Sequence, residues 1–306
     1  MFWTSARYAF PLPDGHRFPI AKYARLREQV INEGIVEPGA VREPERATRD
    51  ALLLVHTADY VDRFLTGRLT PDELRRLGFP WSPALVERSL HAVGGTCEAA
   101  AAALDWGVAM NLAGGTHHAF PDHGEGFCVF NDVAVAVRLL QRAQRVRRVA
   151  IIDLDVHQGN GTNAIFAGDA SVFTFSMHGG RNYPFHKVPG SFDVELPDGT
   201  DDEHYLTQLS EHLPRVIDRA QPDLVIYLAG ADPHEGDKLG RLALTFDGLA
   251  RRDAFVLDVS REVGIPVAIT IAGGYGNIDD TVRIHVETAR IASRYVTSGL
   301  VQRTRN

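Results

Sequence analysis

The chain has 306 residues, of which 44% are hydrophobic and 23% are charged, and its formal net charge is -7. This composition is typical of a globular protein and excludes a wholly disordered or fibrous chain. Because 39 acidic residues outnumber 32 basic ones, we expect no nucleic-acid partner. The only cysteines are Cys97 and Cys128, which excludes a disulfide framework and a cysteine-rich zinc motif.

The N-terminal residues lack the basic stretch and apolar core of a secretory signal. No apolar run approaches the roughly 18 residues that span a bilayer. We therefore expect a cytoplasmic protein with no membrane partner. Because no proline-rich, serine-rich or charge-rich linker interrupts the chain, we also expect one domain over residues 1–306.

The first hundred residues are predicted to be mainly helical. Their spacing and capping residues predict helices at residues 21–33, 72–77 and 83–104. A candidate strand covers residues 51–55. No linker separates this part from the rest of the chain.

From about residue 145 onward, apolar runs alternate with amphipathic segments. The apolar runs predict strands at 149–156, 172–177, 224–229 and 267–272, and helices are expected at 133–145, 202–220 and 249–263. Runs that are apolar on both faces are typical of a parallel sheet covered on both sides. We therefore predict an α/β domain with a mostly parallel sheet flanked by helices on both faces. In such folds, ligand-binding groups collect at the carboxyl ends of the strands.

The strand at 149–156 leads into Asp153, Asp155 and His157. Because side chains alternate along a strand, these three are predicted to share one face. Two carboxylates and a histidine are costly to bury unless a cation neutralises them, and an Asp and a His two residues apart suit zinc. Asp153 alone is explained equally well as an ordinary strand-end cap. All three together favour a metal site.

Two adjacent histidines, His117 and His118, follow a Gly-Gly turn. Such a turn lets the backbone approach closely, so both rings can face one pocket. Histidine titrates near neutrality and can therefore move protons at a metal-activated water. On its own, a pair of surface histidines is the commoner explanation of this motif. The Asp-x-His motif makes the catalytic interpretation the stronger one.

Two further strand ends complete the predicted site. Asp232 follows the strand at 224–229 and supplies a third metal ligand, while Tyr275 lies in a glycine-rich turn after the strand at 267–272. Either residue alone could be a cap or a turn. The Tyr275 phenol can donate a hydrogen bond to an oxyanion that forms beside the metal. Three protein ligands with an open fourth position are typical of catalytic rather than structural zinc.

Six motifs, in order along the chain, resemble those of the zinc-dependent histone deacetylase superfamily, which has the arginase/deacetylase fold. They are GGTHHAF at 114–120, GFCVFND at 126–132, IDLDVHQGNG at 152–161, FSMH at 175–178, AGADPHEGD at 229–237 and AGGYG at 272–276. The resemblance runs from about residue 50 to about residue 290. It implies one catalytic Zn²⁺, bound by Asp155, His157 and Asp232. It further implies that His117 and His118 transfer protons and that Tyr275 polarises the substrate carbonyl.

The resemblance also implies roles for residues around the metal. Asp153 would orient His117 and would help to bind a structural K⁺ together with Ser176. Phe127 would form one wall of the tunnel that receives the acylated lysine. Gly126 would offer its backbone carbonyl to the amide nitrogen of the substrate.

The second aromatic wall has two candidates, Tyr183 and Phe185. Gln158 and Asn160 stand where class I enzymes usually have His and Asp, so His118 would have a neutral amide rather than a carboxylate behind it. This Gln-Gly-Asn variant is similar to the class IV branch and its bacterial relatives. The sequence has no clear counterpart of the rim aspartate that holds the substrate backbone in class I enzymes.

The function implied by the resemblance is a zinc-dependent amidohydrolase that removes an acyl group, acetyl or longer, from the side-chain amine of lysine. The alternative is an acetylpolyamine or other small-amide hydrolase, although the long loop that closes the tunnel in such enzymes is missing here. A ureohydrolase is disfavoured because a two-manganese site needs further carboxylates. A non-catalytic binder of acyl-lysine is also disfavoured, since Tyr275 and all three ligands are present. The oligomeric state is left open.

Overall fold

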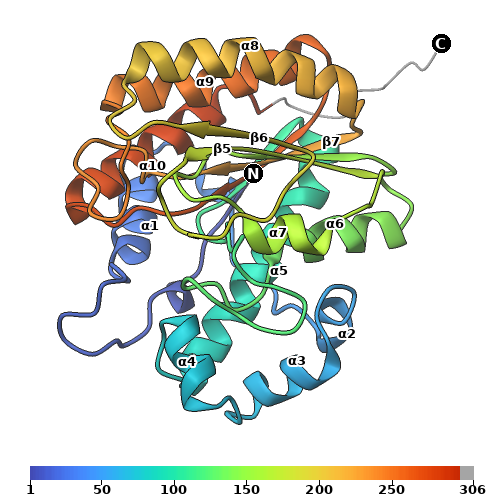
Figure 1. Ribbon diagram of the computed structural model, residues 1–306, viewed down its shortest axis with the longest axis vertical. Coiled ribbons are helices and arrows are strands. Elements are labelled where there is room, and N and C mark those ends of the chain that lie inside the picture. The colour runs from blue at the N-terminus through green and yellow to red at the C-terminus, as the bar shows by residue number, and fades with distance from the viewer. Residues whose placement is uncertain (297–306) are drawn as a thin grey trace.

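One eight-stranded sheet runs through the computed structural model, which describes residues 1–296 (Figure 1). Its strands all pair in parallel, in the order β2-β1-β3-β8-β7-β4-β5-β6. The strands are β1 (Phe2–Trp3), β2 (Val41–Arg42), β3 (Val108–Asn111), β4 (Val149–Asp153), β5 (Val172–Gly179), β6 (Phe192–Leu196), β7 (Leu224–Ala229) and β8 (Val267–Ile271). The predicted parallel α/β sheet is therefore confirmed.

Helices cover both faces of this sheet (Figure 1). One face carries α8 (Asp202–Ala220) and α9 (Phe246–Glu262), and the other carries α5 (Pro83–Trp106) and α6 (Asp132–Arg142). Two more helices pack against each other, α1 (Lys22–Asn32) and α10 (Ile278–Ser293). The helices predicted at 21–33, 83–104, 133–145, 202–220 and 249–263 are confirmed to within three residues at each end.

The central strands are buried on both faces. On β4, Ile152 belongs to the apolar core that includes Leu209 of α8, whereas its neighbour Ile151 belongs to a second core that includes Val133 of α6. Successive side chains of a strand point to opposite faces, so a strand between two helical layers needs apolar residues at every position. This requirement explains the uninterrupted apolar runs of the sequence.

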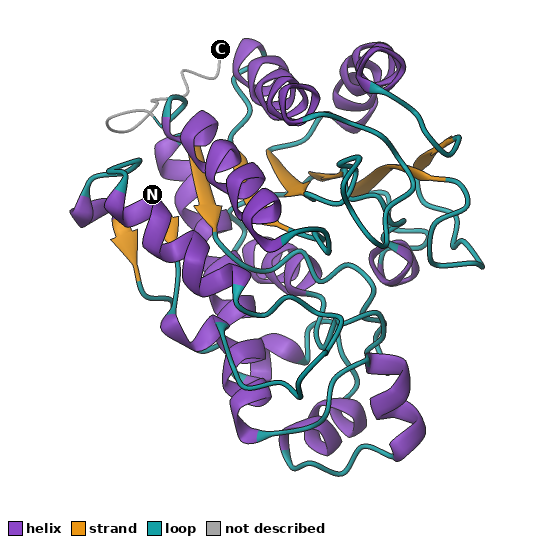
Figure 2. Cartoon of the chain, turned by 90° about the vertical axis from the view of Figure 1, so that its left-hand side faces the viewer, coloured by secondary structure: helices purple, strands orange, loops and turns teal. Residues whose placement is uncertain are grey.

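Three short helices lie below the sheet in Figure 1, where Figure 2 also shows only helices and loops. They are α2 (Arg49–Leu52), α3 (Ala58–Leu65) and α4 (Pro71–Leu77). The prediction of a strand at 51–55 is wrong, because Thr48 caps α2 by accepting a hydrogen bond from the Ala51 N–H. A short apolar run fits one turn of buried helix as well as it fits a strand.

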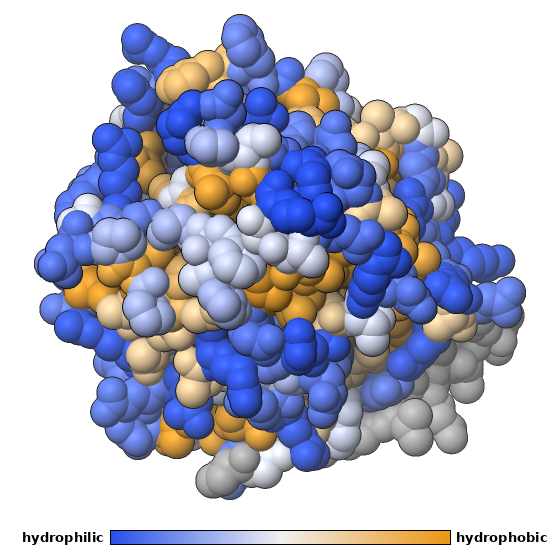
Figure 3. Space-filling view, turned by 90° about the horizontal axis from the view of Figure 1, so that it is seen from below, coloured by the Kyte–Doolittle hydropathy of each residue, from blue (hydrophilic) through white to orange (hydrophobic). Residues whose placement is uncertain are grey.

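The strands β1, β2, β3 and β6 are not predicted by the sequence patterns, and β1 and β2 have two residues each. The edges of the sheet are β2 and β6. Within residues 1–296, none of the helices combines the length and the apolar character that a bilayer crossing requires. Figure 3 shows one face of the molecule from below, where hydrophilic side chains separate smaller apolar areas.

Candidate active site

Three loops meet at the carboxyl edge of the sheet, because β8, β7 and β4 are neighbours. The loop after β4 carries Asp155 and His157, and the loop after β7 carries Asp232. One potential ligand atom from each of these three buried residues lies within 4.8 Å of the other two. The structure thus brings together the three residues that the sequence predicts as metal ligands.

The strand predicted at 149–156 ends at Asp153, three residues earlier than expected. Alternation along a strand therefore does not explain how the next residues converge. Instead, carboxylates hold the turning backbone: Asp153 Oδ1 accepts from the Asp155 N–H at 3.2 Å, and Asp155 Oδ1 accepts from the His157 N–H at 2.9 Å. Aspartate readily makes such local bonds to the backbone two residues later, which favours a turn over a continued strand.

The donor atoms fit a divalent metal ion such as zinc. Asp232 Oδ2 is buried and has no hydrogen-bond partner, although His157 Nδ1 lies only 3.2 Å away. Burial and the nearby Asp155 carboxylate raise the pKa of Asp232 to about 7. A buried acceptor that faces a second carboxylate calls for a cation. Two carboxylates and an imidazole make a donor set suited to zinc with an open position.

Because Gly273 has no side chain, it leaves room for the carboxylates of Asp155 and Asp232. A Cβ atom at this position would lie 1.7 Å from Asp232 Oδ2 and 2.6 Å from Asp155 Oδ2. The Gly273 N–H also donates to Asp155 Oδ2 at 2.6 Å. Any larger residue would push the acidic side chains apart, so this glycine is part of the site.

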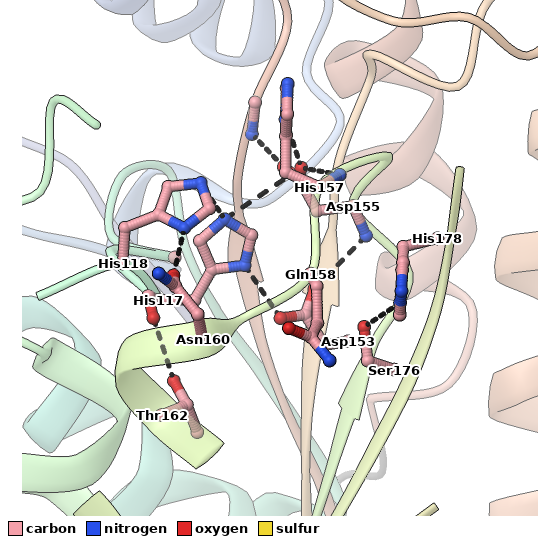
Figure 4. A network of polar contacts seen from close by, with 12 residues as sticks. His117, His118, Asp153, Asp155, His157, Gln158, Asn160, Thr162, Ser176 and His178 are labelled. Carbon is pink, nitrogen blue, oxygen red and sulfur yellow. Dashed lines mark hydrogen bonds and ion pairs between the residues drawn. The ribbon is translucent and has the colours of Figure 1, made fainter. Parts of the chain in front are cut away.

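The two adjacent histidines point into the same pocket (Figure 4). His117 Nδ1 donates to Asp153 Oδ2 at 2.7 Å, and His118 Nδ1 donates to Asn160 Oδ1 at 2.7 Å. Their Nε2 atoms lie 3.1 Å apart. In each ring, therefore, Nδ1 is held by a hydrogen-bond partner and Nε2 faces the pocket.

The surroundings move the pKa values of the two rings in opposite directions. Burial lowers the pKa of His117, but the carboxylates of Asp153 and Asp155 outweigh burial and raise it to about 9. Burial also lowers the pKa of His118, and the positive charges of His117 and His157 lower it further, well below its usual value. Two titratable groups with such separated pKa values are typical of an acid and a base in one catalytic site.

Glu125 supports this arrangement and was not predicted from the sequence. Asn160, the first residue of α7 (Asn160–Ile165), donates through Nδ2 to Glu125 Oε1 at 2.7 Å. The Tyr183 hydroxyl donates to the same oxygen, also at 2.7 Å. Burial raises the pKa of Glu125, but hydrogen bonds from His123 and these two groups outweigh it and hold the pKa below its usual value. No sequence signal distinguishes Glu125, because the two site residues that it holds, Asn160 and Tyr183, lie 35 and 58 residues away.

A cavity of about 530 Å³ leads from the surface to this pocket, and its lining includes His118, His157, Gly126, Phe127 and Tyr275. Its volume lies within the range of about 300–1,000 Å³ that is usual for ligand sites. The Phe127 ring centroid lies 5.9 Å from that of Tyr275. The predicted tunnel residues therefore share one cavity with the imidazoles.

The loop that carries Phe127 is held by α4. Gly126 and Phe127 have φ values of 55° and 65°, and a bulky residue rarely adopts this left-handed conformation. Their N–H groups donate to the carbonyls of Arg76 and Leu77, at 3.2 and 2.8 Å. The end of α4 thus fixes the position of this tunnel wall.

Of the two candidates for the second wall, Tyr183 faces the pocket. Its ring lies edge-on to His118, with centroids 4.9 Å apart. Phe185 lies at the cavity mouth with 81% of its surface exposed. The structure therefore favours Tyr183 as the inner wall.

Two buried cations that were not predicted brace the loops of the site. The Lys22 ammonium donates to the carbonyls of Ala272 and Gly274, which lie in the turn that carries Tyr275. Arg252 donates to the carbonyl of Leu154 at 3.2 Å and to that of Gly230 at 2.8 Å. Each is one basic residue in an amphipathic helix, so the sequence pattern does not mark it as part of a site.

The residues predicted to bind potassium lie side by side. Asp153 of β4 and Ser176 of β5 are paired in the sheet register. Ser176 Oγ also lies 2.9 Å from Nδ1 of His178 (Figure 4). A potassium site at this position stays a prediction.

Comparison with known proteins agrees with this geometry. The histone deacetylase domain family matches residues 16–289. An uncharacterized protein of Picosynechococcus is 48% identical over 91% of this chain and 93% of its own length. Histone deacetylase 2 of Arabidopsis thaliana is 34% identical over 94% of this chain and 75% of its own. A crystal structure of an HDAC homologue complexed with SAHA has a TM-score of 0.82 and 25% identity, covering 96% of this chain and 83% of that one. The chain therefore belongs to the histone deacetylase family of hydrolases.

Proposed function

We propose that this protein is a zinc-dependent lysine deacylase, which hydrolyses the amide between an acyl group and the side-chain amine of lysine. The observation that carries the proposal is the convergence of Asp155, His157 and Asp232 beside two imidazoles, at the inner end of a cavity. Family membership supports a deacetylase, and the unpartnered Asp232 Oδ2 supports a metal-dependent one.

The three ligands would hold the zinc ion, which would polarise the acyl carbonyl and lower the pKa of a water molecule. His118 keeps its Nδ1–H on Asn160, so its Nε2 is an acceptor for a proton of the attacking water. His117, whose pKa Asp153 raises, is suited to deliver a proton to the leaving amine. Burial raises the pKa of Tyr275 well above its usual value, so its phenol keeps the proton that it would donate to the oxyanion.

The tunnel walls support a lysine side chain as the substrate. Phe127 and Tyr183 offer aromatic surfaces to the apolar stem of an acylated lysine, and the Gly126 carbonyl can accept from the amide N–H. We also propose that Asp153 and Ser176 bind a structural K⁺, that the protein belongs to the class IV branch and that it is cytoplasmic.

Metal analysis and a substrate panel test this function together. We expect about one zinc ion per purified chain, and hydrolysis of acyl-lysine peptides that SAHA inhibits. The panel contains acetyl and longer acyl groups on one peptide, together with acetylated polyamines. The Asp232→Asn variant serves as the control that should lose both zinc and activity. A zinc-loaded protein that cleaves only acetylpolyamines would favour the small-amide alternative, and one that cleaves neither would contradict the proposal.

A further inference from the structure

Five basic side chains surround the mouth of the cavity. They come from the segment before α1, from α4 and from the loops after β5 and β7: Arg17, Arg76, Arg181, Lys238 and Arg241. All five are exposed. Among the described residues that line this cavity, none is an aspartate or a glutamate.

Carboxylates elsewhere neutralise little of this charge. Arg181 and Arg241 share one partner, Asp198, at 3.5 and 3.2 Å. Arg17 and Lys238 form no ion pair with any carboxylate of residues 1–296, and the same holds for Arg76. The mouth is therefore strongly positive in a chain whose formal net charge is -7.

Two carboxylates next in sequence to lining residues, Asp237 and Glu125, accept hydrogen bonds from internal groups. Asp237 accepts hydrogen bonds from the N–H groups of Leu239, Gly240 and Tyr275. Glu125 is occupied by Asn160 and Tyr183 inside the pocket. Both carboxylates thus point toward internal donors, and neither lines the cavity.

A ring of like charges around a cleft raises the local concentration of oppositely charged ligands and repels those of the same sign. An acetylated polyamine keeps its remaining ammonium groups, so the mouth repels it. A peptide with aspartate or glutamate beside its acyl-lysine gains attraction at the step of binding. The exposed Phe185 ring adds an apolar contact for the peptide.

We propose that this basic mouth selects acyl-lysine residues that lie within acidic segments of peptides or proteins. The inference rests on the proposed function, because it names the substrate class of the same site. In this proposal the positive charge of the mouth determines which peptides bind well.

The test compares peptides that differ only in the charge of their flanking residues. Three peptides carry the same acyl-lysine between pairs of glutamates, alanines or lysines, and kcat and KM are measured at low salt and at about 0.5 M salt. At low salt we expect the KM of the acidic peptide to be roughly tenfold below that of the basic one, with similar kcat. The difference should shrink to about twofold at high salt, because exposed charges are screened.

Charge-reversal variants test whether the basic side chains of the mouth cause the preference for the acidic peptide. Arg76→Glu and Lys238→Glu should each reduce the preference for the acidic peptide several-fold, and the substitution at position 76 keeps the backbone carbonyl that holds Gly126. The matched control is Arg142→Glu, an exposed arginine at the end of α6 that does not line the cavity. This control should leave the preference unchanged.

The outcomes separate the two proposals. If all three peptides are hydrolysed with equal KM, or if the basic peptide or an acetylpolyamine is preferred, the inference about the mouth is wrong while the deacylase function stands. Equal loss of preference in Arg142→Glu would also overturn it. If none of the peptides is hydrolysed by the zinc-loaded protein, the proposed function itself is contradicted.

Discussion

The Glu125 carboxylate accepts a hydrogen bond of 2.7 Å from Asn160 Nδ2, directly behind the amide oxygen that receives the His118 Nδ1–H. A carboxylate can only accept, so it fixes which end of the Asn160 amide faces the histidine. A neutral amide thus orients His118, and the negative charge lies one residue further away.

Replacing Glu125 by glutamine is expected to lower kcat by about tenfold to a hundredfold, the range typical of residues that orient a catalytic group through a partner. Glutamine can donate as well as accept, so it permits the Asn160 amide to turn and to present its NH₂ to His118. KM should change little, because the carboxylate does not line the cavity. Steady-state kinetics on one acetyl-lysine peptide measure both values. Glu125→Asp is the companion variant and should recover part of kcat. A KM effect alone would point to a role in binding.

Replacing Tyr275 by phenylalanine is expected to lower kcat by about two to three orders of magnitude, the loss typical of one oxyanion donor. The ring contact with Phe127 is kept in this variant, so KM and thermal stability should stay close to those of the wild type. Kinetics and a melting curve on the same sample provide the two readouts. Activity near that of the wild type would show that the Tyr275 hydroxyl is not required for the reaction.

Metal removal is expected to destabilise the wild type but not the Asp232→Asn variant. A ligand present at a thousandfold excess over its Kd stabilises the folded state by about 4 kcal/mol. A chelator should therefore lower the melting temperature of the wild type, and added Zn²⁺ should restore it. In the variant the melting temperature should not respond to either treatment. A chelator effect of equal size in both proteins would place the bound metal elsewhere.

Acidification is expected to destabilise the fold through His56. Its Nδ1 donates to the Phe120 carbonyl at 2.9 Å, and its Nε2 accepts from the Asn131 N–H at 3.0 Å. Burial lowers its pKa from 6.5 to about 4. The unfolded chain therefore binds more protons between these two values, so stability is complete above pH 6.5 and falls as the pH drops toward 4. The loss from this residue alone is about 3 kcal/mol.

Denaturant unfolding at several pH values checks this prediction. Between pH 7 and pH 4 the free energy of unfolding of His56→Gln should fall by about 3 kcal/mol less than that of the wild type. Burial also lowers the pKa of other histidines such as His178. Because these histidines are present in both proteins, the difference between the two plots of unfolding free energy against pH reports His56 alone. Parallel slopes in the two proteins would show that His56 does not contribute.

The central sheet could be predicted from the sequence because burial on both faces leaves its own pattern. β4, β7 and β8 are largely continuous apolar runs. By contrast, β1 and β2 have two residues each and form only by pairing with adjacent strands. The candidate metal ligands and the two adjacent histidines follow these runs or glycine turns closely, so strand ends and motifs together predict their positions. The turn from Asp153 to His157 could not be predicted, since local carboxylate bonds replace the strand there.

The supporting residues of the site escaped prediction for a different reason. Lys22 bonds to a carbonyl that is 252 residues away, and Arg252 reaches the ends of two separate strands. Such contacts depend on the folded arrangement and leave no periodic or local signal. A buried lysine and an exposed one look alike in a single helical pattern.

The cavity wall formed by Phe127 is held by the last carbonyls of α4, a helix outside the sheet, whereas the candidate metal ligands follow the strand ends. Changes of sequence in the segment from α3 to α4 can therefore move the wall without disturbing any ligand or imidazole. Substitutions that change the width of the cavity at Phe127 are therefore separable from substitutions that change the residues at the strand ends.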